Sequence, residues 1–127
     1  MKRILIVDDS PLVLSQLSDD LSNEFNIVTA ESGEEAITIL DDPMRDGICF
    51  SNIFDMIITD LKMPGISGFE LAAYVKQKNK VNRYTPVIML TSESITKEEA
   101  RQHGCVAYIS KADKQRLLSL VRILLTC

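Results

Sequence analysis

Short apolar segments alternate along the chain with stretches of helical periodicity. Residues 3–7 are apolar at both odd and even positions, as expected of a strand that is covered on both faces. Four later segments are also predicted as strands: residues 27–30, 55–60, 86–90 and 106–109. After each strand, in some cases beyond a short loop of turn residues, comes a stretch in which apolar residues recur at helical spacing.

The first and last helices are predicted from this spacing and from a start signal. Ser10 before Pro11 is typical of a helix start, because serine caps free amides and proline suits the first helical position. We expect this helix to end near Phe25. A last amphipathic helix is predicted from five apolar residues: Leu117, Leu118, Val121, Leu124 and Leu125.

Two further helices carry the spacing of a capping box, in which a hydroxyl and a carboxylate three residues apart cap each other's backbone. Ser32 with Glu35 opens the second helix, and Thr96 with Glu99 opens the fourth. Gly104 is predicted to stop the fourth helix, since glycine readily adopts the left-handed conformation found there.

The resulting order is a strand followed by a helix, five times over, within 127 residues. Such alternation implies an α/β fold with a parallel sheet, right-handed crossovers and helices on both faces. The length fits a single domain over residues 1–127. The least regular part is an extended connection at about residues 41–54, where Pro43 ends the second helix.

Composition and charge restrict the possible partners. Hydrophobic residues make up 46% of the chain and charged residues 25%, as in ordinary globular proteins. Fourteen basic and 18 acidic residues give a net charge of −4, which argues against direct nucleic-acid binding. The three cysteines, Cys49, Cys105 and Cys127, show no CxxC spacing and are interpreted as reduced thiols.

The apolar segments are too short for export or membrane insertion. The first run stops at Asp8 after residues 4–7, whereas a secretory core needs about 7–15 apolar residues. No later run approaches the ~18 residues of a membrane span. We therefore expect a soluble, cytoplasmic protein.

Polar residues of particular types follow four of the predicted strands. Asp8 and Asp9 follow the first, Asp60 ends the third, Thr91 follows the fourth, and Lys111 comes just after the fifth. The carboxyl ends of parallel strands share one edge of a sheet, which is where open α/β sheets place their sites. Three carboxylates, a hydroxyl and an ammonium group would then share one pocket.

Three carboxylates in a partly dry site repel one another, and a divalent cation relieves that repulsion. Oxygen ligands with several waters suit Mg²⁺. Softer metals favour cysteine or histidine, and the only histidine, His103, falls in a helical segment. The alternative reading of Asp8 and Asp9 is that they cap the following helix.

Asp60 fits a nucleophile, because a carboxylate can attack phosphorus and form an acyl phosphate. Thr91 could bind a phosphoryl oxygen, and Lys111 could neutralise its charge. Taken singly, each has a plainer reading: a turn-forming aspartate, a structural threonine and a solvated lysine. Their order and their shared edge make the combination more specific than any one of them.

With these residues the chain resembles the receiver domain of two-component response regulators, over residues 2–125. The segments that carry the resemblance are residues 4–10, residues 60–65 with Gly68, residues 91–92 and residues 108–111. The resemblance implies a flavodoxin-like fold with five parallel strands in the order 2-1-3-4-5.

The resemblance also implies roles for the acidic residues. Asp60 would be the phosphoacceptor. Asp9 and Asp60 would bind Mg²⁺ directly, together with the backbone carbonyl of Lys62, whereas Asp8 would act mainly through water. Mn²⁺ can substitute for Mg²⁺ in such a site.

Further roles follow for residues that would respond to phosphorylation. Thr91 would be the switch hydroxyl, Lys111 the partner of the phosphoryl group and Tyr108 the aromatic switch. Lys62 and Glu93 occupy positions that tune the dephosphorylation rate in such domains. If Thr91 moves toward the phosphoryl group, Tyr108 can enter the vacated space, which shifts an existing population of conformers.

The chain departs from the family pattern in three places. Ala112 follows Lys111, where the family usually has a proline after a cis bond. The segment between Thr91 and Lys111 is shortened, so a short or loose fourth helix is expected. The connection at residues 41–54 is longer than usual. It is read either as a tolerated surface insertion or as an interaction element that carries Ile48, Phe50 and Phe54.

The favoured function is a phosphorylation-controlled signalling module rather than a turnover enzyme. Its partners would be a sensor histidine kinase or a histidine phosphotransfer protein, and a downstream effector. A homodimer through the fourth helix, fifth strand and fifth helix is also possible. One alternative is a degenerate receiver that only binds proteins. Another is a metal-dependent phosphohydrolase, although Lys62 stands where such enzymes usually carry a second aspartate.

Overall fold

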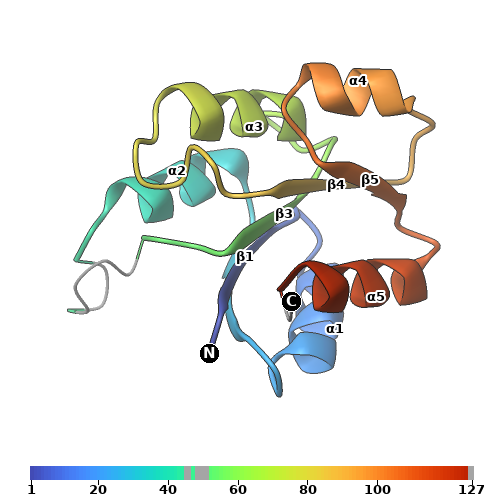
Figure 1. The fold of residues 1–127 in the computed structure, drawn as a ribbon, viewed down its shortest axis with the longest axis horizontal. Coiled ribbons are helices and arrows are strands. Elements are labelled where there is room, and N and C mark those ends of the chain that lie inside the picture. The colour runs from blue at the N-terminus through green and yellow to red at the C-terminus, as the bar shows by residue number, and fades with distance from the viewer. Residues whose placement is uncertain (45–46, 48–51, 126–127) are drawn as a thin grey trace.

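The computed structural model describes residues 1–44, 47 and 52–125, and these form a three-layer α/β sandwich (Figure 1). A five-stranded parallel sheet lies in the middle. The strands are β1 (Arg3–Val7), β2 (Asn26–Ala30), β3 (Met56–Asp60), β4 (Val87–Thr91) and β5 (Ala107–Ser110). The helices are α1 (Pro11–Leu21), α2 (Gly33–Asp41), α3 (Gly68–Gln77), α4 (Lys97–Gln102) and α5 (Lys114–Leu125).

The strand order is β2-β1-β3-β4-β5, as the sequence predicted. The chain begins at β1, the second strand from one edge, moves to that edge with β2, and crosses back over β1 to β3. The register sets Val7 beside Thr59, and Asp60 beside Leu90. The ends of β1, β3 and β4 therefore lie at one edge of the sheet, where the order of the strands changes direction.

The alternation of side chains along each strand produces two cores, one on each face of the sheet. Leu5 and Val7 of β1 pack with α2, α3 and α4, whereas Ile4 and Ile6 pack with α1 and α5. All four side chains are at most 1% exposed. Burying each of them contributes roughly 1.5–3 kcal/mol, so both faces of β1 hold the sandwich together.

Two helix predictions need correction. The first helix ends at Leu21 rather than near Phe25, because the amides of Glu24 and Phe25 both turn back to the Leu21 carbonyl. Phe25 is nevertheless buried, which explains its place in the apolar pattern. Glu35 caps α2 differently from a capping box: its carboxylate accepts from the Glu31 amide, although its own amide bonds the Ser32 hydroxyl as expected.

The fourth helix agrees with its prediction. Thr96 and Glu99 form a full capping box, and Gly104 follows the helix with a φ of 81°. The helix spans only 6 residues, in line with the shortened segment seen in the sequence. A second full capping box, between Ser67 and Glu70 at the start of α3, was not predicted.

The extended connection is anchored where it returns to the sheet. Phe54 is 3% exposed and belongs to the core. The prediction that it forms part of an interaction element is therefore wrong. Asn82 fixes this segment by accepting from the Phe54 amide at 2.9 Å and donating to the Asn52 carbonyl at 2.7 Å. The predicted contributions of Ile48 and Phe50 lie outside the described residues.

Within the described part of the chain, no helix combines the length and the apolar character that crossing a bilayer requires.

Candidate functional site

Three carboxylates gather at the edge of the sheet where β1 and β3 end. One oxygen each of Asp8, Asp9 and Asp60 lies within 4.8 Å of the others. Asp60 is the last residue of β3 and is 5% exposed, Asp8 is fully buried, and Asp9 is exposed. The site therefore contains two buried carboxylates, Asp8 and Asp60, and one that is open to solvent, Asp9.

Asp8 is fixed by the start of the first helix. One of its oxygens accepts a hydrogen bond from the Ser10 amide at 2.9 Å, and the Ser10 hydroxyl in turn caps the Val13 amide. Ser10 is therefore the residue that caps α1, and Asp8 supports it from outside the helix instead of capping the helix itself. Asp8 uses one oxygen only for this, and the other faces Lys111.

Lys111 bridges the two buried carboxylates. Its ammonium nitrogen lies 2.9 Å from Asp8 Oδ2 and 3.1 Å from Asp60 Oδ2. Burial would lower the pKa of Lys111, but the hydrogen bonds to Asp8 and Asp60 outweigh it, and the pKa is raised. The lysine is therefore held in its charged form between the two aspartates.

The pKa of Asp60 is raised above its ordinary value, chiefly because burial disfavours the charged carboxylate. The negative charges of Asp8 and Asp9 raise it further, whereas the hydrogen bond from Lys111 opposes the rise. Asp60 is thus a destabilised anion, and a cation near it would lower its free energy.

Thr91 ends β4 and is 2% exposed. Its hydroxyl oxygen accepts a hydrogen bond from the Glu93 amide at 2.9 Å, which holds the following loop. Among the described residues its hydroxyl proton has no acceptor. This buried hydroxyl therefore retains one hydrogen bond to donate.

The loop that carries Lys111 is held without a proline. The Lys111 amide bonds the Thr91 carbonyl at 2.9 Å, which ties the residue to the end of β4. The Lys111–Ala112 peptide bond is trans. The Ala112 amide donates to the Ser110 hydroxyl at 3.1 Å, a bond that proline could not make because it has no N–H. At Ala112 a hydrogen bond to the Ser110 hydroxyl thus fixes the loop in place of the usual proline.

Gly68 packs directly under the acidic site. Its amide bonds the Leu61 carbonyl at 2.8 Å. A Cβ at this position would lie 2.3 Å from the carbonyl oxygen of Asp60 and 2.8 Å from the sulfur of Met89. Only glycine leaves room for this approach, which fixes the backbone on which Asp60 stands.

The rim of the site is crossed by an exposed ion pair. Lys62 Nζ lies 2.8 Å from the carboxylate of Glu93, and this contact raises the pKa of Lys62. Both residues line a hollow of about 700 Å³. The sequence singled out both positions but gave no sign that the two side chains meet.

Tyr108 lies on β5, the edge strand of the sheet beside β4. It pairs with Met89 on β4 and is half-buried against the core that includes Ala100 of α4. Its role as a switch residue remains a prediction.

The structure brings the predicted residues together as the strand ends implied. Asp8, Asp9, Asp60 and Lys111 form one cluster, and Thr91 joins it through its register with Ser110. What the sequence did not reveal is the contact of Gly68 with the Asp60 carbonyl. Its only signal was a glycine at a helix start, which fixes no tertiary contact.

Comparison with known families identifies the class to which this fold and site belong. Residues 4–122 match the family model of the response regulator receiver domain. The chain therefore belongs to the receiver-domain family, a class of signalling domains in two-component response regulators, as the sequence predicted.

Individual relatives agree with this. The chain is 33% identical over 126 residues to a probable transcriptional regulator, ycf29, of Pyropia yezoensis, and it spans 52% of that protein. It is also 33% identical over 122 residues to the transcriptional regulatory protein GlrR of Escherichia coli, of which it spans 25%. The chain thus spans about half or less of the length of these relatives.

Solved structures share the fold over nearly the whole chain. The chemotaxis response regulator CheY4 of Vibrio cholerae superposes with a TM-score of 0.82 at 29% identity, covering 98% of this chain and 99% of that one. The response regulator TrrA of Thermotoga maritima, solved in complex with Mg²⁺ and BeF, gives 0.77 at 35% identity, covering 98% and 100%.

Proposed function

We propose that this chain is a phosphoacceptor switch in which Asp60 receives a phosphoryl group from a phosphohistidine. The donor would be a sensor histidine kinase or a histidine phosphotransfer protein, and the output a downstream effector. The observation that carries the proposal is the buried Asp60 carboxylate, which lies 3.1 Å from Lys111 and beside two further carboxylates. We treat residues 1–127 as one such domain.

In the proposed step, an Asp60 oxygen attacks phosphorus and a new P–O bond forms. The P–N bond to the donor histidine breaks, and its electron pair returns to the imidazole. The ammonium group of Lys111 can neutralise the negative charge that spreads over the phosphoryl oxygens. The Thr91 hydroxyl can donate its remaining hydrogen bond to one of these oxygens. Positioning and charge neutralisation of this kind supply most of the catalysis in phosphoryl transfer.

The acidic cluster fits a divalent cation. Its donors are carboxylate oxygens close together, the ligand type that Mg²⁺ prefers, and the destabilised Asp60 anion would gain from a nearby cation. We propose that Asp9, Asp60 and the backbone carbonyl of Lys62 would hold Mg²⁺ directly, with Asp8 acting through water, and that Mn²⁺ can substitute. When bound, such an ion neutralises charge between the acceptor and the incoming phosphoryl group.

The proposed output is a change in the face that carries α4, β5 and α5. A phosphoryl group adds about −1.5 to −2 charges. We propose that Thr91, in rotating to donate its hydroxyl proton to this group, weakens the hydrogen bond from the Glu93 amide and so loosens the loop before α4. Tyr108 would then move into the space left by Thr91 and alter the surface between α4 and β5.

The proposal is tested by incubating the protein with Mg²⁺ and acetyl phosphate and measuring intact mass. The expected result is one added phosphoryl group that survives acid and is lost in base, as an acyl phosphate should be. Asp60→Asn should abolish the adduct, and exposed Asp55→Asn at the other end of β3 should not. A native protein that gains no adduct would contradict the proposal and leave a degenerate, protein-binding receiver.

A metal-dependent phosphohydrolase that uses Asp60 as nucleophile would need a second acid or base beside it. Lys62 occupies the position where that residue usually stands, and its ammonium is engaged by Glu93 at 2.8 Å. The geometry therefore favours the switch over the hydrolase.

A further inference from the structure

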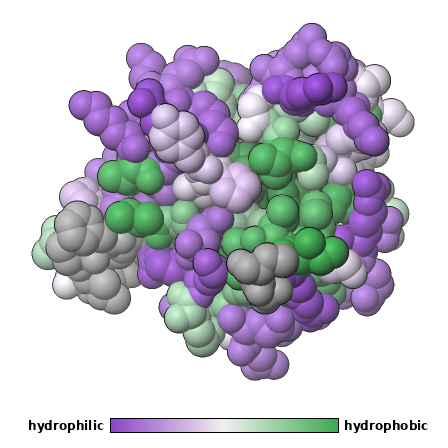
Figure 2. All heavy atoms as spheres, in the orientation of Figure 1, coloured by the Kyte–Doolittle hydropathy of each residue, from purple (hydrophilic) through white to green (hydrophobic). Residues whose placement is uncertain are grey.

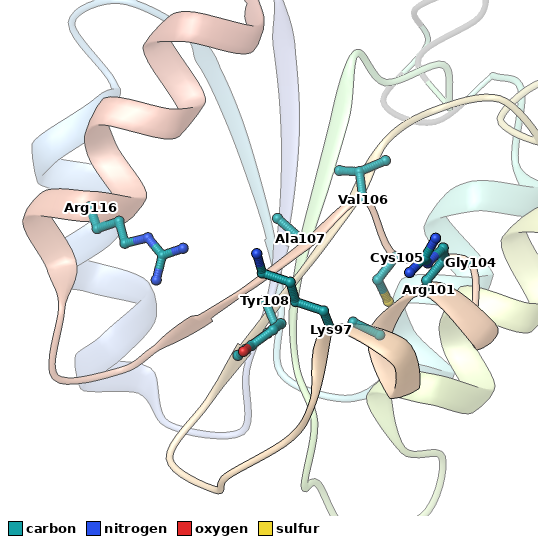
Figure 3. A pocket seen from close by; sticks show the side chains of 9 residues that line it. Lys97, Arg101, Gly104, Cys105, Val106, Ala107, Tyr108 and Arg116 are labelled. Carbon is teal, nitrogen blue, oxygen red and sulfur yellow. The ribbon is translucent and has the colours of Figure 1, made fainter.

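The connection between α3 and β4, residues 78–86, lies at the end of the sheet opposite the acidic site. It leads into the start of β4, whereas Thr91 ends that strand, and the five strand residues span about 16 Å. Figure 1 draws this connection beside the segment that leads into β3. None of its residues lines the hollow of about 680 Å³ between α4, β5 and α5, where Lys97 and Arg116 lie (Figure 3).

The α3–β4 connection has its uncharged polar side chains inside and its apolar and charged side chains outside. Asn79, Asn82 and Thr85 are at most 8% exposed, whereas Val81 and Tyr84 are 51% and 88% exposed. The buried residues recur every three positions, so the two residues between them face solvent each time. Large apolar side chains are normally favoured in the interior, so folding alone does not explain why these two lie outside.

Hydrogen bonds from the buried side chains hold the connection against the segment before β3. The side-chain nitrogen of Asn82 donates to the Asn52 carbonyl at 2.7 Å and to Asn79 Oδ1 at 3.0 Å, and its oxygen accepts from the Phe54 amide at 2.9 Å. Ile53, which is 40% exposed, therefore lies beside the connection. Figure 2 shows a small apolar area at the left, between the grey atoms and hydrophilic side chains, where Figure 1 draws these two segments. Because the backbone is fixed from inside, binding through the outer side chains costs little backbone freedom.

The outer side of the connection is basic. Residues 71–92 include four cations and no acidic residue. Lys76 turns inward, because its ammonium donates to a backbone carbonyl, that of Thr85, at 2.8 Å. Lys78, Lys80 and Arg83 are exposed, and none of these three forms an ion pair with a described residue. Three cations are thus available to a partner.

Two aspartates border this basic side, and both are engaged elsewhere. Asp41 accepts hydrogen bonds from the Tyr74 hydroxyl and from the side chain of Asn79. Asp55 accepts from the Arg3 amide at 2.8 Å. The positive charge of the connection is therefore not neutralised by these neighbours.

A projecting basic loop of this kind fits a flat anionic surface. At 88% exposure, Tyr84 projects into solvent instead of lining a groove. Membrane interfaces favour tyrosine and basic side chains beside aliphatic ones. A protein partner normally needs roughly 20–30 residues on each side, more than this connection supplies. Single-stranded nucleic acid is usually held by several stacked aromatics, and the connection has one, in a protein whose net charge is −4.

We propose that the α3–β4 connection binds the surface of an anionic membrane. Val81 and Tyr84 enter the lipid interface, and Lys80 and Arg83 contact the phosphate groups of the lipids. The contact is peripheral and reversible. The acidic site then faces away from the membrane at the other end of the sheet. The inference goes beyond the proposed phosphorylation and does not depend on it.

The chain contains no tryptophan, so a Tyr84→Trp variant reports on this connection alone. The probe is phosphatidylcholine vesicles with or without phosphatidylglycerol. Tryptophan emission should shift to shorter wavelength with the anionic vesicles only, and high salt should reverse the shift. A Leu12→Trp variant, at a 65% exposed position near the start of α1 and at the other end of the sheet, should show no shift.

Vesicle sedimentation measures the strength of binding in the wild-type protein. Lys80→Ala with Arg83→Ala should weaken binding about twentyfold, since each cation near an anionic surface is worth about a factor of five. Lys80→Arg with Arg83→Lys keeps the charge and should retain binding. The matched control, Lys97→Ala with Arg116→Ala, removes two cations from the hollow of Figure 3 and should leave binding unchanged.

Several outcomes would overturn the proposal. They are a wild-type protein that does not bind anionic vesicles, equal binding to neutral vesicles, equal shifts of Tyr84→Trp and Leu12→Trp, and equal loss in the two alanine pairs. Tighter binding of the connection to a single-stranded oligonucleotide or to a glutamate-rich peptide would overturn it as well. Vesicle binding needs no phosphoryl group, so its failure and a failure of Asp60 phosphorylation are separate results.

Discussion

The ammonium group of Lys111 lies 3.1 Å from the carboxylate of Asp60, so the two residues are already paired before any phosphoryl group arrives. Lys111 also holds Asp8 at 2.9 Å. A group added to Asp60 must therefore share this lysine or displace it from one aspartate. The resting site thus holds Lys111 in contact with both aspartates at once.

Asp60→Asn should stabilise the protein at neutral pH in the absence of divalent cations. The pKa of Asp60 is raised in the folded state, so ionising it costs folding free energy. The cost is absent well below the ordinary pKa of 3.8, where the carboxyl is protonated whether folded or not, and it grows as the pH rises through the raised pKa of the folded state. The gain in melting temperature over wild type should therefore grow as the pH rises above about 4.

In the Asp60→Asn variant Lys111 keeps Asp8 as an ion-pair partner. The stability lost with the Lys111–Asp60 pair is therefore limited. Thermal melts in a chelating buffer at several pH values measure the effect, with Asp55→Asn as the exposed control. An Asp60→Asn variant that is less stable than wild type at neutral pH would show that the Lys111 pair outweighs burial and repulsion.

Mg²⁺ should raise the thermal stability of the wild-type protein. A ligand that binds only the folded state adds about 2.7 kcal/mol when its concentration is 100 times its dissociation constant. Asp9→Ala should remove most of the rise, because Asp9 is the exposed carboxylate of the cluster. An exposed aspartate elsewhere, replaced as Asp19→Ala, serves as the control. A rise that persists in Asp9→Ala would place the ion away from this cluster.

Gly68→Ala should destabilise the protein by about 1–3 kcal/mol, the usual cost of overpacking. The added Cβ would stand 2.3 Å from the Asp60 carbonyl oxygen, so the backbone must move. Helix propensity alone would favour alanine by about 1 kcal/mol, which makes any loss attributable to the contact. In urea unfolding, this loss of stability should appear as a lower midpoint with an unchanged slope. An unchanged midpoint would mean that α3 shifts freely.

Cys105 should react slowly with thiol reagents in the native protein. Burial raises the pKa of its thiol to about 11, so little of the reactive thiolate is present at neutral pH. The measurement follows labelling in a Cys49→Ser, Cys127→Ser background, with and without urea. Labelling of the folded protein as fast as that of the unfolded one would show that the loop between α4 and β5 opens readily.

The order of the elements was predictable because both faces of the strands are covered, which leaves unbroken apolar runs such as residues 4–7. The acidic cluster was predictable for a related reason: parallel strands end at one edge, so residues after β1 and β3 must meet. Phe25 was misassigned because a residue can be buried from a turn as readily as from a helix.

Other features depend on contacts that no local pattern encodes. The ion pair of Lys62 and Glu93 joins two loops that are distant in sequence. Lys97 of α4 and Arg116 of α5 line the same hollow, and only the tertiary fold brings these two helices to it. The anchoring of Phe54 by Asn82 is also a tertiary contact.

The central claim, that Asp60 itself carries the phosphoryl group, is tested most directly by borohydride reduction of the phosphorylated protein. The reagent converts an acyl phosphate to an alcohol and leaves free carboxylates intact. Mass mapping of the digested protein should then find homoserine at position 60, and unreduced aspartate at positions 8 and 9. Homoserine at either of those positions with intact Asp60, or a phosphorylated protein without any homoserine, would contradict the account.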